Sequence, residues 1–261
     1  MTSKELFLFA SYHKNFPVPK ASYVCPIHAG KAISKTSLPF EGDNTGDHIS
    51  HLNEFYSELT VIYWVWKNFN REYVKYWGIV HYRRFFCNDT FIGRIKKKSI
   101  YSYAATQQAL DAVLNDTLEQ SFLEDFKEYD VILQRPMYVY KKKGIIKSIN
   151  QHYGDEHFAS DWKVTQDILL EKYPEYKKSI HFFDQPKMSF FNMMMAPWHV
   201  WDDYLEWLFD ILFEVDKQIQ KAEDPYQRRV MGYLSERLIN LYFFHNSQYK
   251  IKYYPIASFE K

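Results

Sequence analysis

Glycine is scarce in this chain, with only eight among 261 residues. The two glycine-rich phosphate loops most easily read from a sequence, G-x-G-x-x-G and G-x-x-x-x-G-K-[ST], are both absent. If the protein binds a nucleotide diphosphate, we therefore expect side chains to hold it, and not a glycine-lined backbone loop.

Cysteine and long apolar runs are scarce too. Cys25 and Cys87 are the two cysteines and form no C-x-x-C pair, which argues against a disulfide framework and against a cysteine-rich zinc site. The N-terminal residues lack the apolar run of a signal peptide, and no stretch approaches the roughly 20 apolar residues of a membrane span. We expect a soluble, cytoplasmic protein.

Neither sign of charge is in excess. The chain has 33 Lys and Arg residues and 32 Asp and Glu residues, for a formal net charge of +1. Proteins that bind duplex nucleic acid usually carry a clear basic excess, and single-strand binders need a basic groove interleaved with aromatics. The sequence therefore predicts no nucleic-acid partner.

The chain is rich in core-forming residues, with 46% hydrophobic and 19% aromatic. Short apolar runs predict strands and longer helical periodicities predict helices, in alternation along the chain. We interpret this as one α/β domain with a mostly parallel central sheet flanked by helices. The expected strands are 5–11, 23–27, 76–82, 129–134, 187–196 and an extended 249–256, and the expected helices are 50–69 (N-capped by Ser50), 105–127, 161–173, 198–221 and 225–244, with 138–161 irregular.

Polar side chains follow several of these strands, where open α/β sheets usually bind their ligands. His81, Arg83 and Arg84 end the strand 76–82. Two adjacent guanidiniums can donate forked hydrogen bonds to phosphate or carboxylate. Neighbouring strand residues point to opposite faces, so a structural ion pair for one arginine is an equal alternative.

Two further segments are dense in polar groups. Asp43 and Asp47, in the loop 42–50, could hold a metal, a sugar or a ribose, although a turn followed by a capped helix explains the same residues. Asp155, His157 and Asp161 could supply a metal ligand or a general base, but no established zinc spacing is present. Asp161 is equally well placed to N-cap the following helix.

Three charged groups have a simple solvent-exposed interpretation. Glu236 and Arg237 lie off the apolar stripe of the last helix, which predicts a solvated face unless that helix borders a cleft. The lysine runs 96–98 and 141–143 are typical of solvated surface, or of contact with anionic lipid headgroups.

Several motifs in a fixed order resemble a known family. These are 40–50 (FEGDNTGDHIS), 56–60 (YSELT), 63–68 (YWVWKN), 78–86 (GIVHYRRFF), 191–193 (FNM), 206–212 (EWLFDIL) and 232–238 (GYLSERL). Together they resemble bacterial capsular and exopolysaccharide synthesis proteins, a family similar to glycosyltransferases of the GT-A type. Some members are thought to transfer galactofuranose.

The resemblance implies a single nucleotide-diphosphosugar-binding domain over 1–261, with the donor in the N-terminal half and the acceptor side and C-terminal helices over about 135–261. It implies a nucleotide-sugar donor, with UDP as the expected nucleotide, and a glycan or lipid-linked acceptor, with peripheral contact to the inner membrane. The implied substrate-binding residues are Tyr12, His13, His28, Gly30, Asp47, Asn53, Tyr56, Glu58, His81, Arg83, Arg84, His157, Asn192 and Arg237.

One departure from GT-A enzymes concerns the metal. Many of them keep an Asp-x-Asp that binds Mg²⁺ or Mn²⁺ where this chain has His81, Arg83 and Arg84. Cationic side chains can neutralise a leaving diphosphate in place of a metal, so we expect no metal ligands and metal-independent catalysis. For an inverting transfer, the candidate general bases are Asp161, Asp155 and Glu236, in that order of preference.

Overall fold

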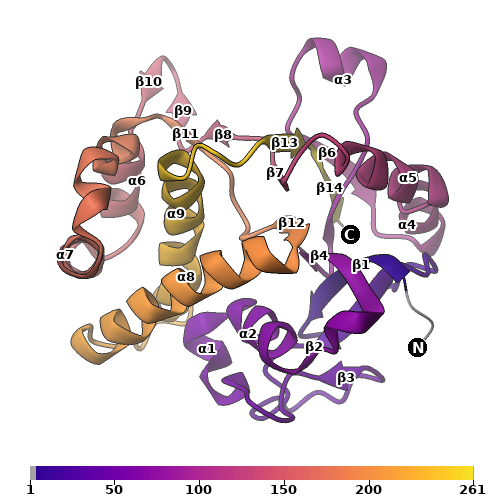
Figure 1. The fold of residues 1–261 in the computed structure, drawn as a ribbon, viewed down its shortest axis with the longest axis horizontal. Coiled ribbons are helices and arrows are strands. Elements are labelled where there is room, and N and C mark those ends of the chain that lie inside the picture. The colour runs from indigo at the N-terminus through magenta and orange to yellow at the C-terminus, as the bar shows by residue number, and fades with distance from the viewer. Residues whose placement is uncertain (1–3, 261) are drawn as a thin grey trace.

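The computed structural model describes residues 4–260, and its centre is a large sheet (Figure 1). Within those residues the sheet contains ten strands. The main path runs β13 (Ile251–Tyr254), β7 (Val131–Gln134), β12 (Met194–Pro197), β4 (Val74–His81), β1 (Lys4–Tyr12), β2 (Val24–His28) and β3 (Glu41–Gly42). The sheet is extended by β5 (Arg84–Phe86), β6 (Ile100–Ala104) and β14 (Ile256–Glu260).

Within residues 4–260, five of the nine strand pairs of the large sheet are parallel, which confirms the predicted fold class. β1 pairs in parallel with β2 and β4, as do β2 with β3, β7 with β13, and β6 with β14. β12 is antiparallel to both β4 and β7. β5 turns back antiparallel to β4, so the chain reverses directly after His81.

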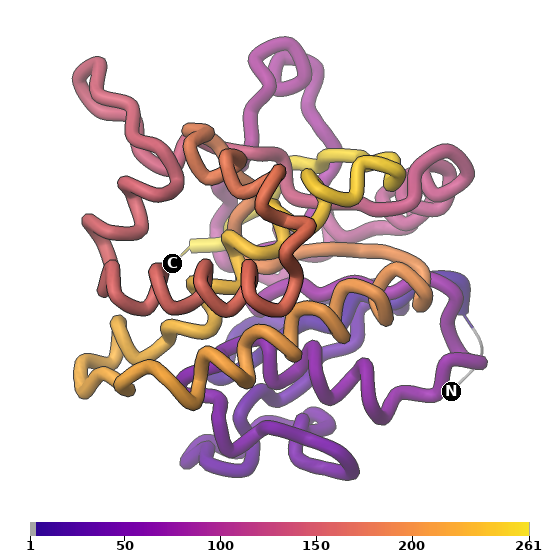
Figure 2. The backbone as a smooth tube through the Cα atoms, turned by 60° about the vertical axis from the view of Figure 1, so that its left-hand side comes forward, coloured from indigo at the N-terminus to yellow at the C-terminus, as the bar shows by residue number. Residues whose placement is uncertain are grey.

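Helices cover both faces of the sheet, which is why β1 and β4 are apolar along almost their whole length. Phe7, Phe9 and Trp77 face the core shared with α2 (Leu59–Asn68), α7 (Ala159–Lys172), α8 (Trp198–Gln218) and α9 (Val230–His245). Leu6 and Leu8 face the core shared with α4 (Gln107–Val113) and α5 (Asp116–Asp125). Figure 2 shows α8 running alongside the sheet.

Two predicted helices are interrupted. The segment 50–69 is divided into η1 (Ser50–Leu52), α1 (Asn53–Tyr56) and α2, because Ser57 adopts a positive φ of 50°. Ser50 is not an N-cap, since its hydroxyl donates to the buried Asp43 carboxylate. The segment 105–127 is divided into α4 and α5, and the Asn115 side chain caps α5 by accepting from Leu118 N at 3.0 Å.

The part predicted to be irregular is ordered. It contains a hairpin of β9 (Lys141–Lys142) and β10 (Ile145–Ile146), followed by α6 (Ile149–Glu156), which Ser148 and Gln151 begin with a capping box. α7 begins after Phe158, so Asp161 lies in its first turn and is not its N-cap. β8 (Met137–Tyr138) precedes this part, and η3 (Pro174–Lys178), η4 (Ile180–Asp184) and β11 (Lys187–Met188) follow α7. η2 (Arg71–Tyr73) precedes β4.

No helix within residues 4–260 is both long and apolar enough to cross a membrane.

Candidate active site

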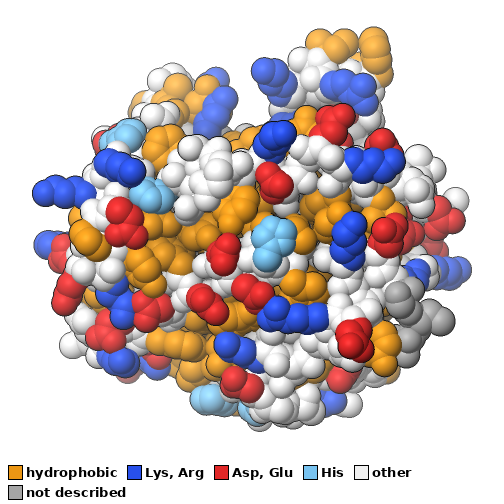
Figure 3. All heavy atoms as spheres, in the orientation of Figure 1, with side chains coloured by type: hydrophobic (Ala, Val, Ile, Leu, Met, Phe, Trp, Pro, Cys, Tyr) orange, Lys and Arg blue, Asp and Glu red, His pale blue; other side chains and the backbone are white. Residues whose placement is uncertain are grey.

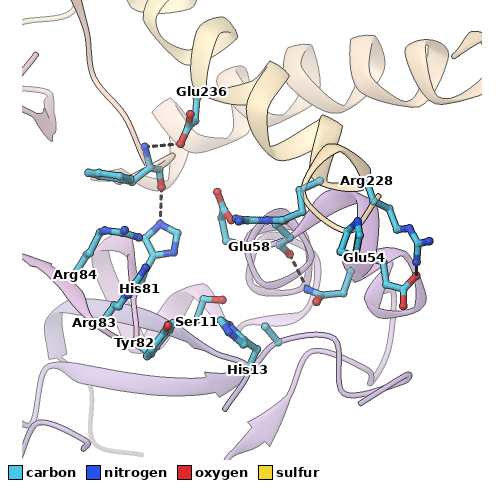
Figure 4. Close-up of a pocket in the computed structure, with 16 residues that line it drawn as sticks. Ser11, His13, Glu54, Glu58, His81, Tyr82, Arg83, Arg84, Arg228 and Glu236 are labelled. Carbon is cyan, nitrogen blue, oxygen red and sulfur yellow. Dashed lines mark hydrogen bonds and ion pairs between the residues drawn. The ribbon is translucent and has the colours of Figure 1, made fainter. Parts of the chain in front are cut away.

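A cavity of about 410 Å³ lies at the carboxyl ends of β1, β2 and β4. Its opposite wall comes from α1, α9 and η5 (Gln227–Arg229), as Figure 4 shows. The cavity brings together seven of the residues predicted from the sequence: His13, Asn53, Glu58, His81, Arg83, Arg84 and Glu236. The sheet topology accounts for this position, since parallel strands deliver the residues that follow them to one edge.

His81 is the last residue of β4 and is held in one orientation. Its Nε2 donates to the carbonyl oxygen of Phe191 at 2.6 Å, which leaves Nδ1 as the acceptor nitrogen. Burial lowers the pKa of His81 and outweighs Glu58 and the Phe191 carbonyl, which raise it, while Arg84 acts in the same direction as burial. We therefore assign a neutral imidazole to His81 at pH 7.

Three arginines give the cavity a surplus of positive charge. Within residues 4–260, neither Arg83 nor Arg84 nor Arg229 forms an ion pair with a carboxylate. The Arg84 guanidinium lies over the Phe191 ring at 4.5 Å, and burial followed by Arg83 lowers its pKa. The Nε of Arg83 is buried without a hydrogen-bond partner among the described residues. The structural ion pair considered for this arginine pair is thus not formed, and free guanidiniums are suited to an anion.

Arg228 and Arg229 are cavity residues that the sequence did not single out. Both lie on η5 or at its end, and they reach the cavity from a segment far along the chain. Arg228 is neutralised by Glu54 at 3.0 Å, whereas Arg229 donates from Nε to the Ser57 hydroxyl at 3.0 Å. Arg228 and Arg229 are adjacent in the sequence, and adjacency is the same signal that singled out Arg83 and Arg84.

Two carboxylates face this positive charge. Oε1 of Glu236 accepts from the backbone N–H of Phe191 at 2.8 Å, and Oε2 lies 3.1 Å from Nη1 of Arg237. Burial raises the pKa of Glu236, and the nearby Glu58 adds to the rise, while Arg237 opposes it. The predicted solvated face is wrong for Arg237, which is only 2% exposed. The alternative of a helix that borders a cleft holds for Glu236, which lines the cavity.

A strained turn connects these groups. Phe191 and Asn192, just before β12, have positive φ angles of 72° and 52°. The Asn192 amide donates to Oε1 of Glu58 at 2.6 Å and to Gly232 O at 3.1 Å, and its oxygen accepts from Ser235 Oγ at 2.9 Å. Backbone strain of this kind persists only where surrounding contacts fix it, and it concentrates at functional sites.

Several residues implied by the resemblance do not line the cavity. Tyr12 and Tyr56 are fully buried, so their rings are not available to stack on a base or a sugar. His28 is also buried, and Gly30, with φ +64°, packs against the Asn53 side chain. Asp47 lies outside the cavity, where it accepts from the Tyr63 hydroxyl at 3.2 Å.

Four more predicted residues lie behind or beside the cavity. Asn192 and Arg237 are buried and support Glu58 and Glu236 from behind. His157 is stacked on Tyr233 with ring centroids 4.1 Å apart. Asp43, the other acid of the loop 42–50, accepts from the backbone N–H groups of Gly30 and Lys31, so it organises the loop after β2.

Of the three candidate bases, only Glu236 lines the cavity. Asp155 forms an exposed ion pair with Lys147. Asp161 is buried at the start of α7, where burial raises its pKa. Its position in the cavity therefore favours Glu236 as the general base.

The residues at this strand end do not fit a divalent metal. Mg²⁺ and Mn²⁺ prefer several oxygen ligands, whereas guanidiniums occupy the end of β4. Within residues 4–260, no group of three or more His, Cys, Asp or Glu side chains is arranged to hold an ion.

Known proteins resemble this chain in sequence and in fold. The family model described as Domain of unknown function (DUF4422) matches residues 8–247. The chain belongs to this family. It is also similar to a solved apo structure of WbbM, a bifunctional glycosyltransferase, with a TM-score of 0.86 and 27% sequence identity. The match covers 99% of this chain and 46% of that one, so this chain spans about half of WbbM. No curated protein matches the chain.

The likeness to a glycosyltransferase agrees with the resemblance that the motifs predict.

Proposed function

We propose that this chain is a glycosyltransferase that moves a sugar from a nucleotide-diphosphosugar to a glycan acceptor. The observation that supports it most is the cavity itself, where three arginines form no ion pair with a carboxylate. Arg83 and Arg84 lie at the strand ends, and Arg229 lies on the facing wall with Glu58 and Glu236. A diphosphate supplies the negative charge that the arginines lack, and a transferred sugar would lie between it and the carboxylates. The likeness to WbbM supports the same class of reaction.

The proposed step is an inverting displacement. The acceptor hydroxyl oxygen attacks the anomeric carbon as the bond from that carbon to the diphosphate oxygen breaks, and the bonding electron pair stays on the diphosphate. Glu236 takes the hydroxyl proton, a role that its raised pKa favours. The arginines stabilise the charge that grows on the leaving group, so the proposal needs no metal.

The finer parts of the proposal come from the motif resemblance. We propose a UDP-linked donor, with galactofuranose as one candidate sugar, and a polysaccharide or lipid-linked acceptor in capsule, O-antigen or exopolysaccharide synthesis. The reaction would take place in the cytoplasm, at the inner face of the membrane.

Incubation with a panel of nucleotide sugars and acceptor glycans, with detection of released UDP, tests the proposal. We expect UDP release with one of the donors. That release should depend on the presence of an acceptor and should continue in EDTA. Activity lost in EDTA and restored by Mn²⁺ would overturn the metal-free step. Glycan binding without affinity for any nucleotide would instead identify a non-catalytic carbohydrate-binding protein.

A further inference from the structure

Two projections rise from the same side of the molecule. One is α3 (Phe91–Ile95) with the lysines that follow it, and the other is the β9–β10 hairpin. Figures 1 and 2 show both above the rest of the chain in two views. We call residues 91–98 the helical tip and residues 141–146 the hairpin tip.

Both tips expose large apolar side chains. The four most exposed large hydrophobic residues among residues 4–260 all lie here: Phe91 (81%), Ile95 (69%), Ile92 (63%) and Ile145 (57%). Ile146 is 47% exposed beside them. In Figure 3 apolar atoms occupy the end of the right-hand projection with basic side chains just below, and on the left-hand projection apolar and basic side chains lie side by side. Clustered apolar exposure of this kind marks an interaction surface.

Both tips are also basic without any acid of their own. The helical tip carries Arg94 and the lysines 96–98, and the hairpin tip carries the lysines 141–143. No Asp or Glu occurs within 90–110 or 137–154. Among residues 4–260, none of these seven cations forms an ion pair.

The fold presents the tips in defined shapes. Thr90 caps α3 by accepting from Gly93 N at 3.0 Å. The hairpin turns through Lys143 and Gly144, whose φ angles of 49° and 81° match the two-residue turn that right-twisted strands prefer. The apolar side chains are therefore held outward by ordered structure, and they serve no core.

We propose that the two tips dock the protein on a bilayer that contains anionic phospholipid. Apolar ends would enter the headgroup boundary, while the seven cations contact anionic headgroups. A second copy of the chain is a poorer occupant, because face-to-face pairing would oppose two sets of like charges. This inference does not depend on the transferase proposal, since it concerns a different surface.

Cosedimentation of the full chain with vesicles tests the proposal. We expect binding to phosphatidylcholine vesicles that contain 30% phosphatidylglycerol, weaker binding at higher salt, and little binding to pure phosphatidylcholine. The variants K96E/K97E and Phe91→Ser with Ile92→Ser should each lower partitioning at least tenfold. The matched control K177E/K178E makes the same charge change at exposed positions elsewhere and should stay within twofold of the wild type.

Three results would overturn the proposal. These are absence of binding to anionic vesicles, an equal loss in the control variant, and a change of oligomeric state on substitution of the tips, measured by light scattering. Circular dichroism and thermal unfolding of each variant separate a docking defect from a folding defect.

Discussion

At the scale of single residues, the site depends on charges that the fold leaves without partners. Within residues 4–260 four arginines form ion pairs with carboxylates, among them Arg71 with Asp202 and Arg135 with Asp89. Arg83, Arg84 and Arg229 differ, and all three line one cavity. Arg83 and Arg84 are half-buried there, and Arg229 is exposed. Removing cations even partly from water costs free energy unless an anion completes the site. The ligand we propose for that place is a diphosphate.

Replacement of either arginine after β4 should weaken nucleotide binding. We expect Arg83→Ala and Arg84→Ala each to raise the Kd for UDP about tenfold to a hundredfold, because a hydrogen bond to a charged group contributes about 1.5–3 kcal/mol. Isothermal titration calorimetry measures this. Arg71→Ala removes an arginine outside the cavity and serves as the control. Unchanged affinity in both cavity variants would remove the phosphate role.

Glu236 should act in the chemical step and not in donor binding. We expect Glu236→Gln, which keeps the size of the side chain, to lower kcat by about a hundredfold or more, because the proton acceptor is lost. The Kd for UDP should change less than threefold. A variant that keeps its kcat would leave Glu58 and Glu54, the other two carboxylates that line the cavity, for this role.

At the scale of elements, the turn before β12 joins the strand ends to α9. Phe191 contacts His81 through its carbonyl and Glu236 through its N–H, while Asn192 contacts Glu58. The sequence predicted one strand over 187–196 and could not show this turn. Its positive φ angles occur at Phe and Asn, not at glycine, so no local residue preference marks it strongly.

Asn192→Asp should destabilise the protein by placing a second carboxylate beside Glu58. We expect the free energy of unfolding to fall by roughly 2–4 kcal/mol at pH 7, because two buried like charges replace a hydrogen bond. Urea unfolding measures it. Adding Glu58→Gln should restore part of the loss. A double variant no more stable than Asn192→Asp would show that the contact does not carry the effect.

His157 joins α6 to η5 and α9, and it makes stability depend on pH. Burial, with Arg237 and His152 acting in the same direction, lowers the pKa of His157 to about 4, while the hydrogen bond with Gln227 opposes the shift. An unfolded histidine titrates near pH 6.5, so between about pH 6.5 and pH 4 the unfolded chain binds the extra proton. The free energy of unfolding should therefore fall as the pH drops through that range.

For His157 this loss should be roughly 1–3 kcal/mol, and His157→Gln should show a smaller decrease between pH 7 and pH 4.5. Urea unfolding at several pH values compares the two proteins. Parallel stability curves would contradict the assignment, as would an NMR titration of His157 with a midpoint near 6.5.

Helical periodicity also failed where an element has more than one neighbour. The apolar residues of 50–69 keep helical spacing across the break at Ser57, so the sequence predicts a single helix there. These residues are Leu52, Phe55, Leu59, Ile62 and Trp66. α9 is the opposite case, since packing on several sides buries Arg237 and half-buries Glu236, both of which lie off its apolar stripe. Periodicity in a sequence indicates which single face of a helix is packed. It does not show where a helix breaks, as at Ser57, or that a helix such as α9 is packed on several faces.

At the scale of the whole molecule, the topology explains which site residues could be predicted from the sequence. Parallel pairing of β1, β2 and β4 delivers the residues after each strand to one edge, so the strand pattern alone groups His13, His81 and Arg83. Arg229 could not be grouped with them, because its place depends on how the C-terminal helices fold back over that edge. A net charge near zero likewise hides a local surplus of cations.

The most direct test of the central claim is a crystal structure of the protein soaked with UDP in the presence of EDTA. We predict the diphosphate in the cavity at the end of β4, with its oxygens within hydrogen-bond distance of Arg83, Arg84 or Arg229 and no cation beside it. A nucleotide bound elsewhere, or one that enters this cavity only with a divalent metal, would contradict the account.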